Sequence, residues 1–200
     1  MSTNSTQSTN QISSRNRLRI ICESGVMLAL AAVLSLIQLW HSPYGGSVTL
    51  LSMLPIVIIS MRHGTKVGLS VSFIYSLIQI GIDLAKLMGY GMTIDTWIGS
   101  LLFDYLIAFT VLGLAGLWRK HGIWAQVGGT AFVIFLRFCS HVISGYIFFG
   151  VFAPEGWNPL LYSLFYNAVY MIPELISTVV AAFIIFRLKV FSRILTVRNQ

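Results

Sequence analysis

Residues 123–149 read IWAQVGGTAFVIFLRFCSHVISGYIFF, and this stretch decides the fold class. It contains no acidic residue, and Arg137 and His141 are its only basic ones. A helix needs about 20 mostly apolar residues to cross the roughly 30 Å hydrocarbon layer of a bilayer. The stretch exceeds that length, so it predicts a transmembrane helix.

Five further apolar blocks flank this one. Of the 200 residues, 56% are hydrophobic and 10% are charged, whereas a soluble domain carries about 25% charged residues. The six blocks lie near Leu18–Trp40, Val48–Met61, Lys66–Leu84, Trp97–Trp118, Ile123–Phe149 and Pro159–Leu188. We expect the short second block to run tilted or to be shielded by its neighbours, since lipid leaves exposed backbone groups without partners. The predicted fold is an all-α integral membrane bundle of six transmembrane helices, forming a single domain over residues 15–200.

Positive charge gathers at alternate ends of the blocks. Eleven of the thirteen Lys and Arg residues share one face: Arg15, Arg17, Arg19, Arg62, Lys66, Arg119, Lys120, Arg187, Lys189, Arg193 and Arg198. The other connections hold Lys86 together with Asp83, Asp95 and Glu155. Cytoplasmic loops carry the excess of Lys and Arg, so both termini are predicted to be cytoplasmic. A nucleic-acid-binding surface would instead need these cations clustered on a soluble fold.

Outside the membrane blocks the sequence offers few functional signals. Residues 1–14 form a polar, uncharged tail that we expect to be disordered, because it cannot bury enough apolar surface. Cys22 and Cys139 fall inside membrane blocks, so we predict small hydrophobic side chains and no disulfide. The sequence shows no phosphate-binding loop, and we predict neither a metal site nor a cofactor. Any ATP-driven transport would therefore need another chain.

Five ionisable residues fall at membrane depth: Glu23, Asp104, Arg137, His141 and Glu174. Such side chains are costly in lipid and point to a protein interior or a cavity. We favour snorkelling or partner contact for Glu23 and, slightly, a structural role for Glu174, which follows a proline. Asp104 either pairs with Arg137 or His141 or binds a cationic ligand, and either alternative places the fourth helix against the fifth.

A stripe on the fifth helix contains Arg137, His141, Gly145 and Phe149, spaced by four residues. Gly145 leaves a notch in which a planar ligand can stack on an aromatic ring and bond to the imidazole. The alternative is a glycine at a helix-packing contact beside a histidine that a neighbouring helix satisfies. The stripe alone leaves both open.

The sixth helix opens with a row of tyrosines. Tyr162, Tyr166 and Tyr170 are spaced by four, and such residues near a membrane boundary are usually an interfacial belt. Asn167, about two turns into the block, requires a hydrogen-bonding partner. On the first helix, Gly25 and Ala29 form a pair of small residues that lets another helix backbone approach closely.

At this point the chain resembles the thiamin-specific, ThiT-type S components of energy-coupling factor vitamin transporters. The resemblance covers nearly the whole chain after the tail. It is carried by ESGVMLALAAVLSLI, LSMLPIVIISMRHGTKVGL, LDYLIAFTVLGLAGLWRK (read from Leu102 and allowing for Phe103), and RFCSHVISGYIFFGVFAPEGWNPLLYSLFYNA.

The resemblance implies that the chain is a non-enzymatic subunit of a transporter in a bacterial cell membrane and that it captures thiamin from outside. It also implies a substrate site. The implied substrate-binding residues are Asp104, Tyr105, His141, Gly145, Phe149, Tyr162 and Asn167. It also implies partners, namely a transmembrane coupling subunit and two ATPases, docking on the face with Gly25 and Ala29. The sequence departs from the family where Asp104 replaces a Glu and Phe149 a Trp, and a second pocket Trp has no match in HSPYGGSV.

From thiamin's chemistry, Asp104 can accept from the aminopyrimidine or balance the thiazolium cation, and His141 and Asn167 can fix polar edges. Phe149, Tyr105 and Tyr162 can line or stack on the rings. We expect the ligand to enter a pocket between helices four, five and six. The loops Trp40–Val48 and Gly150–Pro159 would roof that pocket.

Three rival functions stay open at this point. One is a standalone proton-coupled carrier that uses Asp104, His141 and Glu174 as relay groups. A second is an S component for another vitamin or for a thiamin precursor. The third, an intramembrane serine hydrolase using Ser140 or Ser144 with His141, is disfavoured because no strand-turn-helix elbow frames the serine.

Overall fold

The computed structural model describes residues 3–42 and 45–188, with side chains from residue 14 onward. It consists of helices α1 (Thr3–Leu36), α2 (Leu54–His63), α3 (Thr65–Gly89), α6 (Ile123–Phe148) and α7 (Pro159–Arg187) and of a composite fourth span over Ile94–Trp118. Five of these six are long and apolar enough to cross a membrane, and α2 is the sixth, shorter one. The predicted six-helix membrane bundle is confirmed.

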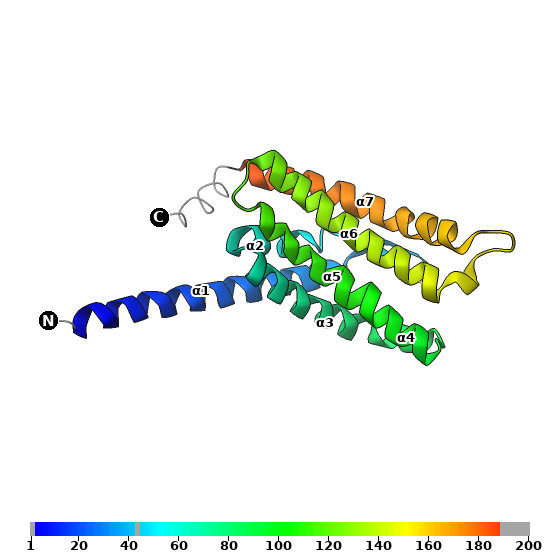
Figure 1. Cartoon of the computed structure of the whole chain (residues 1–200), viewed down its shortest axis with the longest axis horizontal. Coiled ribbons are helices and arrows are strands. Elements are labelled where there is room, and N and C mark those ends of the chain that lie inside the picture. Colours follow the sequence, from blue (N-terminus) through cyan, green and yellow to red (C-terminus); the bar gives the residue numbers. More distant parts are fainter. Residues whose placement is uncertain (1–2, 43–44, 189–200) are drawn as a thin grey trace.

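The first helix begins earlier than its apolar block. α1 runs from Thr3, so helical backbone continues through most of the tail that we predicted to be disordered. Its membrane span is Ser14–Leu36, and it packs mainly against α2 and α3. The described ends of α1 and α7 lie at the same end of the bundle (Figure 1), as an even number of crossings requires. Disorder of residues 1–14 stays a prediction, and Lys189, Arg193 and Arg198 lie outside the described residues.

The short second helix is shielded by protein, as expected. At about 1.5 Å per residue, ten residues span only about 15 Å, half of the hydrocarbon layer. Eight of the ten residues are buried: Leu54, Pro55, Ile56, Val57, Ile59, Ser60, Met61 and His63.

Two predicted helix ends are wrong, because a β-hairpin takes their place. β1 (Gln38–His41) pairs antiparallel with β2 (Ser47–Thr49), so the first helix stops at Leu36 and the second starts only at Leu54. The turn includes Gly45 and Gly46 at φ +101° and +82°, conformations that disfavour other residues. Gly46 also lies against the Tyr170 ring, where a Cβ atom would come within 2.5 Å of a ring carbon.

The fourth span changes its helical pitch three times. It consists of α4 (Ile94–Ser100), the π-helix η1 (Leu101–Ile107), α5 (Ala108–Thr110) and the 3₁₀ helix η2 (Val111–Trp118). No residue of η1 is fully buried, whereas Leu112, Gly113, Ala115 and Gly116 of η2 are. Within the span, η1 is therefore the loosely packed segment, and η2, at the C-terminal end, is tightly packed.

Glycines hold that end together. A Cβ on Gly113 would lie 2.4 Å from the backbone N of Leu69, and one on Gly68 would lie 2.6 Å from the Gly113 carbonyl oxygen. A Cβ on Gly116 would lie 2.4 Å from the backbone N of Thr65. Such distances mean that α3 and η2 touch backbone to backbone. We call the region around Gly68, Gly113 and Gly116 the packed half of the bundle.

Candidate functional site

The opposite half of the bundle encloses a cavity of about 400 Å³, within the roughly 300–1,000 Å³ of small-molecule sites. Its walls come from the C-terminal part of α3, from α4 and η1, from α6 and α7, and from the β1–β2 hairpin. All seven predicted site residues line it: Asp104, Tyr105, His141, Gly145, Phe149, Tyr162 and Asn167. We call this region the hollow half. The cavity reaches further than predicted, because α3 and the hairpin form walls in addition to helices four, five and six.

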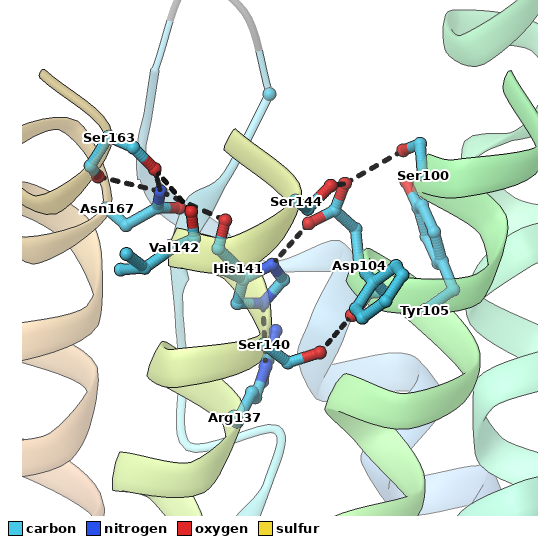
Figure 2. A network of polar contacts seen from close by, with 12 residues as sticks. Ser100, Asp104, Tyr105, Arg137, Ser140, His141, Val142, Ser144, Ser163 and Asn167 are labelled. Carbon is cyan, nitrogen blue, oxygen red and sulfur yellow. Dashed lines mark hydrogen bonds and ion pairs between the residues drawn. The ribbon is translucent and has the colours of Figure 1, made fainter. Parts of the chain in front are cut away.

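The Asp104 carboxylate is the centre of a polar network (Figure 2). Its Oδ2 accepts hydrogen bonds from the Ser144 hydroxyl at 2.6 Å and the Ser100 hydroxyl at 2.9 Å, and its Oδ1 lies 2.9 Å from His141 Nδ1. The open pitch of η1 brings Asp104 to α6, so the predicted contact between helices four and five is present.

Arg137 completes this network from one turn below. Its Nε–H donates to His141 Nε2 at 3.3 Å, so Nε2 is an acceptor and the imidazole proton resides on Nδ1. His141 therefore donates to Asp104 and is neutral. The Arg137 guanidinium also lies 4.1 Å from the centre of the Phe109 ring, a cation–π contact. The predicted pairing of Asp104 with His141 is therefore present, and binding of a ligand by Asp104 stays a prediction.

Gly145 is a packing glycine at the cavity wall. A Cβ there would lie 2.3 Å from Ser163 Oγ and 3.3 Å from Asn167 Nδ2, so α7 occupies the notch that we considered for a ligand. The Ser163 hydroxyl donates to the Val142 carbonyl at 2.9 Å, which fixes α7 against α6 (Figure 2).

The tyrosine row does not form the usual interfacial belt. The Tyr170 hydroxyl is buried and donates to Asn167 Oδ1 at 2.5 Å, while the Tyr166 hydroxyl donates to the Gly45 carbonyl at 2.9 Å. The belt interpretation is therefore wrong for these two, which connect α7 internally and to the hairpin. Asn167 has the predicted partners, since its Nδ2 also donates to the Ser163 carbonyl at 2.9 Å.

Aromatic rings surround the rest of the cavity. Tyr162 and Tyr166 have ring centres 5.8 Å apart, and Phe149 stacks on Phe152 at 6.2 Å. Tyr105 lies on the opposite wall, where its hydroxyl donates to Asp83 Oδ2 at 3.2 Å. The site can therefore hold a planar ligand between π faces while a carboxylate holds one polar edge.

The α3 wall was missed from the sequence. Gln79, Asp83, Lys86 and Tyr90 all line the cavity, at spacings of four, three and four residues. That spacing places them on one helical face, and it was the signal available for finding them. We assigned Asp83 and Lys86 to the connection that follows the third block, which was drawn to end near Leu84, whereas α3 continues to Gly89 and contains both residues.

The two remaining membrane carboxylates have structural partners. Glu174 Oε1 accepts from both the backbone N and the hydroxyl of Thr49, so it fixes β2 to α7 and fits the structural role that we favoured. Glu23 pairs with Arg62 and His63 at 2.6 Å and with Arg19 at 2.8 Å. Glu23 therefore joins α1 to α2 within the chain, and the partner contact that we favoured as an alternative stays a prediction.

The geometry gives no support to hydrolase or metal chemistry. The Ser140 hydroxyl donates to the Phe103 carbonyl and that of Ser144 to Asp104, so neither pairs with His141 as a nucleophile pairs with its base. Within residues 3–42 and 45–188, no group of three His, Cys, Asp or Glu is placed to hold a metal ion. Both cysteines are unpaired thiols.

Comparisons with known proteins agree on one family. The family model described as "Thiamine transporter protein" matches residues 21–192. The thiamine transporter ThiT of Bacillus subtilis is 34% identical over 187 residues, covering 86% of this chain and 92% of that protein. ThiT of Lacticaseibacillus paracasei is 27% identical over 177 residues, covering 82% and 85%.

One solved structure has the same fold. ThiT from Listeria monocytogenes superposes with a TM-score of 0.60 at 20% identity, covering 92% of this chain and 97% of that one. These family members are transporters and not enzymes.

Proposed function

The chain belongs to the thiamine transporter protein family, and from that membership we propose that it binds thiamin in the cavity of the hollow half and passes it across the membrane. The observation that carries the proposal is the Asp104 network, a partly buried carboxylate held in place at the wall of an aromatic-lined cavity. A fixed acceptor beside π faces suits a ligand with an exocyclic amine on a flat ring.

The number of free acceptor positions on Asp104 indicates how many hydrogen bonds it can accept from a ligand. An ionised carboxylate has about four lone-pair positions, and Ser100, Ser144 and His141 occupy three of them. One position is left, which matches a single N–H of the aminopyrimidine. His141 and Asn167 already use their ring and amide atoms within the protein, so they position the site. Tyr105, Tyr162 and Phe149 supply the faces on which the rings stack.

The proposed orientation in the membrane rests on the positions of the cationic residues. Arg62, Lys66, Arg119 and Lys120 lie at the packed end of the bundle, which by the positive-inside rule faces the cytoplasm. The cavity lies in the other half, with the hairpin over it. We therefore propose cytoplasmic termini and a site that fills from outside.

Energy would come from partner subunits. The face of α1 away from α2 and α3 is exposed at Gly25 and Ala29, and a Cβ on Gly25 would meet no atom within 4 Å. Ile21, Val26 and Val33 are also more than half exposed on this helix. As the resemblance to S components implies, a transmembrane coupling subunit with two ATPases would dock there.

Calorimetric titration of the purified protein tests the ligand. We expect submicromolar binding of one thiamin per chain and no binding of riboflavin or biotin. Submicromolar binding of another vitamin, with none for thiamin, would refute the assignment.

Uptake into proteoliposomes tests the partner. The chain alone should bind but not accumulate thiamin, and accumulation should require the coupling subunit, the ATPases and ATP. Gly25→Leu should block accumulation and leave binding intact, whereas Gly128→Leu on α6, where space is also open, should change neither. Robust accumulation by the chain alone would establish the carrier alternative instead.

A further inference from the structure

Four formally charged side chains line the cavity: Asp83, Lys86, Asp104 and Arg137. They form two groups. Arg137 and Asp104 belong to α6 and η1 and are joined through His141, whereas Asp83 and Lys86 are neighbours on α3. The two groups are held in different ways.

In the Arg137–His141–Asp104 group, the charges are balanced and most acceptor positions are occupied. The negative charge of Asp104 is balanced by Arg137 through a neutral imidazole, and two hydroxyls and the imidazole direct three hydrogen bonds at the carboxylate. An added cation would gain little there, because the group is neutral as a whole and its acceptor positions are nearly filled.

In the Asp83 group, the carboxylate is only weakly bonded and partly exposed. Asp83 Oδ1 lies 3.3 Å from Lys86 Nζ and its Oδ2 lies 3.2 Å from the Tyr105 hydroxyl, both long for hydrogen bonds to a carboxylate. The Lys86 side chain is 55% exposed and that of Asp83 26%. An exposed ion pair on neighbouring turns contributes little, so another cation can replace Lys86 readily.

We propose that Asp83 is the counter-ion of the ligand's permanent cation, and that Lys86 occupies this position until the ligand displaces it. The inference rests on the proposed function and settles which carboxylate balances the thiazolium. The aminopyrimidine bonds to Asp104, and the cationic ring lies toward α3.

Tyr105 connects the two ends of this arrangement. It follows Asp104 in the chain and bonds to Asp83, so its ring lies between the two carboxylates. A cation beside this ring gains a cation–π contact as well as the charge of Asp83. Asp83 therefore selects for charge, and Asp104 selects for the amine.

The test compares thiamin with 3-deazathiamin, a neutral isostere in which a thiophene replaces the thiazolium ring. Asp83→Asn should weaken thiamin binding about tenfold and change binding of the neutral isostere less than about twofold. The amide oxygen of Asn still accepts from Tyr105, so the wall keeps its hydrogen bond. The tenfold difference should shrink at high salt, as expected for a charge partly open to water.

Two control variants separate charge from structure. Lys86→Ala removes the competing cation and should tighten thiamin binding about threefold without affecting the isostere. Asp104→Asn should weaken both ligands alike. An equal loss of both ligands in Asp83→Asn, or no loss of thiamin, would overturn the proposal. If the unmodified protein binds neither compound, the proposed function itself fails, which is a distinct result.

Discussion

In the packed half of the bundle, α3 and the fourth span touch backbone to backbone at Gly68 and Gly113, whereas in the hollow half the side chains of Tyr105 and Asp83 join the same two spans by a hydrogen bond. One pair of helices thus serves two purposes along its length. Contacts between backbones leave no room for adjustment, and contacts between side-chain tips do. The difference predicts that substitutions in the packed half change stability, while those in the hollow half change affinity.

The largest expected effect is the loss of binding in His141→Ala. Removing the imidazole leaves Asp104 and Arg137 without their shared partner, so the carboxylate loses its orientation. We expect thiamin affinity to fall at least about a hundredfold, or roughly 2.7 kcal/mol, by calorimetry. The melting temperature of the ligand-free protein should change little. A large fall in that melting temperature would contradict the prediction that substitutions in the hollow half change affinity and not stability.

The next effect is on stability, in Gly113→Ala. The new methyl group would overlap the backbone of Leu69, and backbone can yield only by separating α3 from η2. We expect a loss of about 2 kcal/mol of folding free energy, measured as a lower melting temperature in detergent. Gly128→Ala is the matched control, because a Cβ there meets open space and should cost less than about 0.5 kcal/mol. Equal stability of the two variants would contradict the backbone contact between α3 and η2 at Gly113.

A smaller effect on affinity is expected for Ser144→Ala. The variant removes one of the three donors to Asp104 and leaves the other two in place. We expect thiamin binding to weaken about five- to tenfold, near 1 kcal/mol, by calorimetry. Ser140→Ala is the control, because its hydroxyl bonds to the Phe103 carbonyl and not to Asp104. Binding lost entirely in Ser144→Ala would show that the serine does more than orient the carboxylate.

Much of the fold could be predicted because the membrane restricts the possibilities. Apolar length and the positions of Lys and Arg indicated six helices, and a short block such as α2 had to be covered by protein. The hairpin was missed since Leu39, Trp40 and Val48 are as apolar as helix residues. Gly45 and Gly46 are typical of a turn, but hydropathy does not register the backbone angles that define a hairpin.

The site was predictable in part for a similar reason. Asp104 and His141 are costly in lipid, so their presence alone indicated a protein interior or a cavity. Asp83 was assigned to a loop, since a carboxylate near a block end signals an interface as readily as a binding site. Tyr166 and Tyr170 resembled a belt for the same reason. Their inward orientation depends on how α7 rotates against the hairpin, which no local pattern specifies.

The π-helix η1 has a consequence for how this protein can evolve. Each residue added to an α-helix turns everything beyond it by about 100°, which would normally move every packed glycine off its partner. The wide turn at Leu101–Ile107 absorbs such a change locally, and Phe103, the residue that interrupts the family pattern, lies inside it. A residue inserted into or deleted from η1 should therefore redirect Asp104 while Gly113 and Gly116 keep their places, so the direction of the carboxylate and the packing of the same span can change separately.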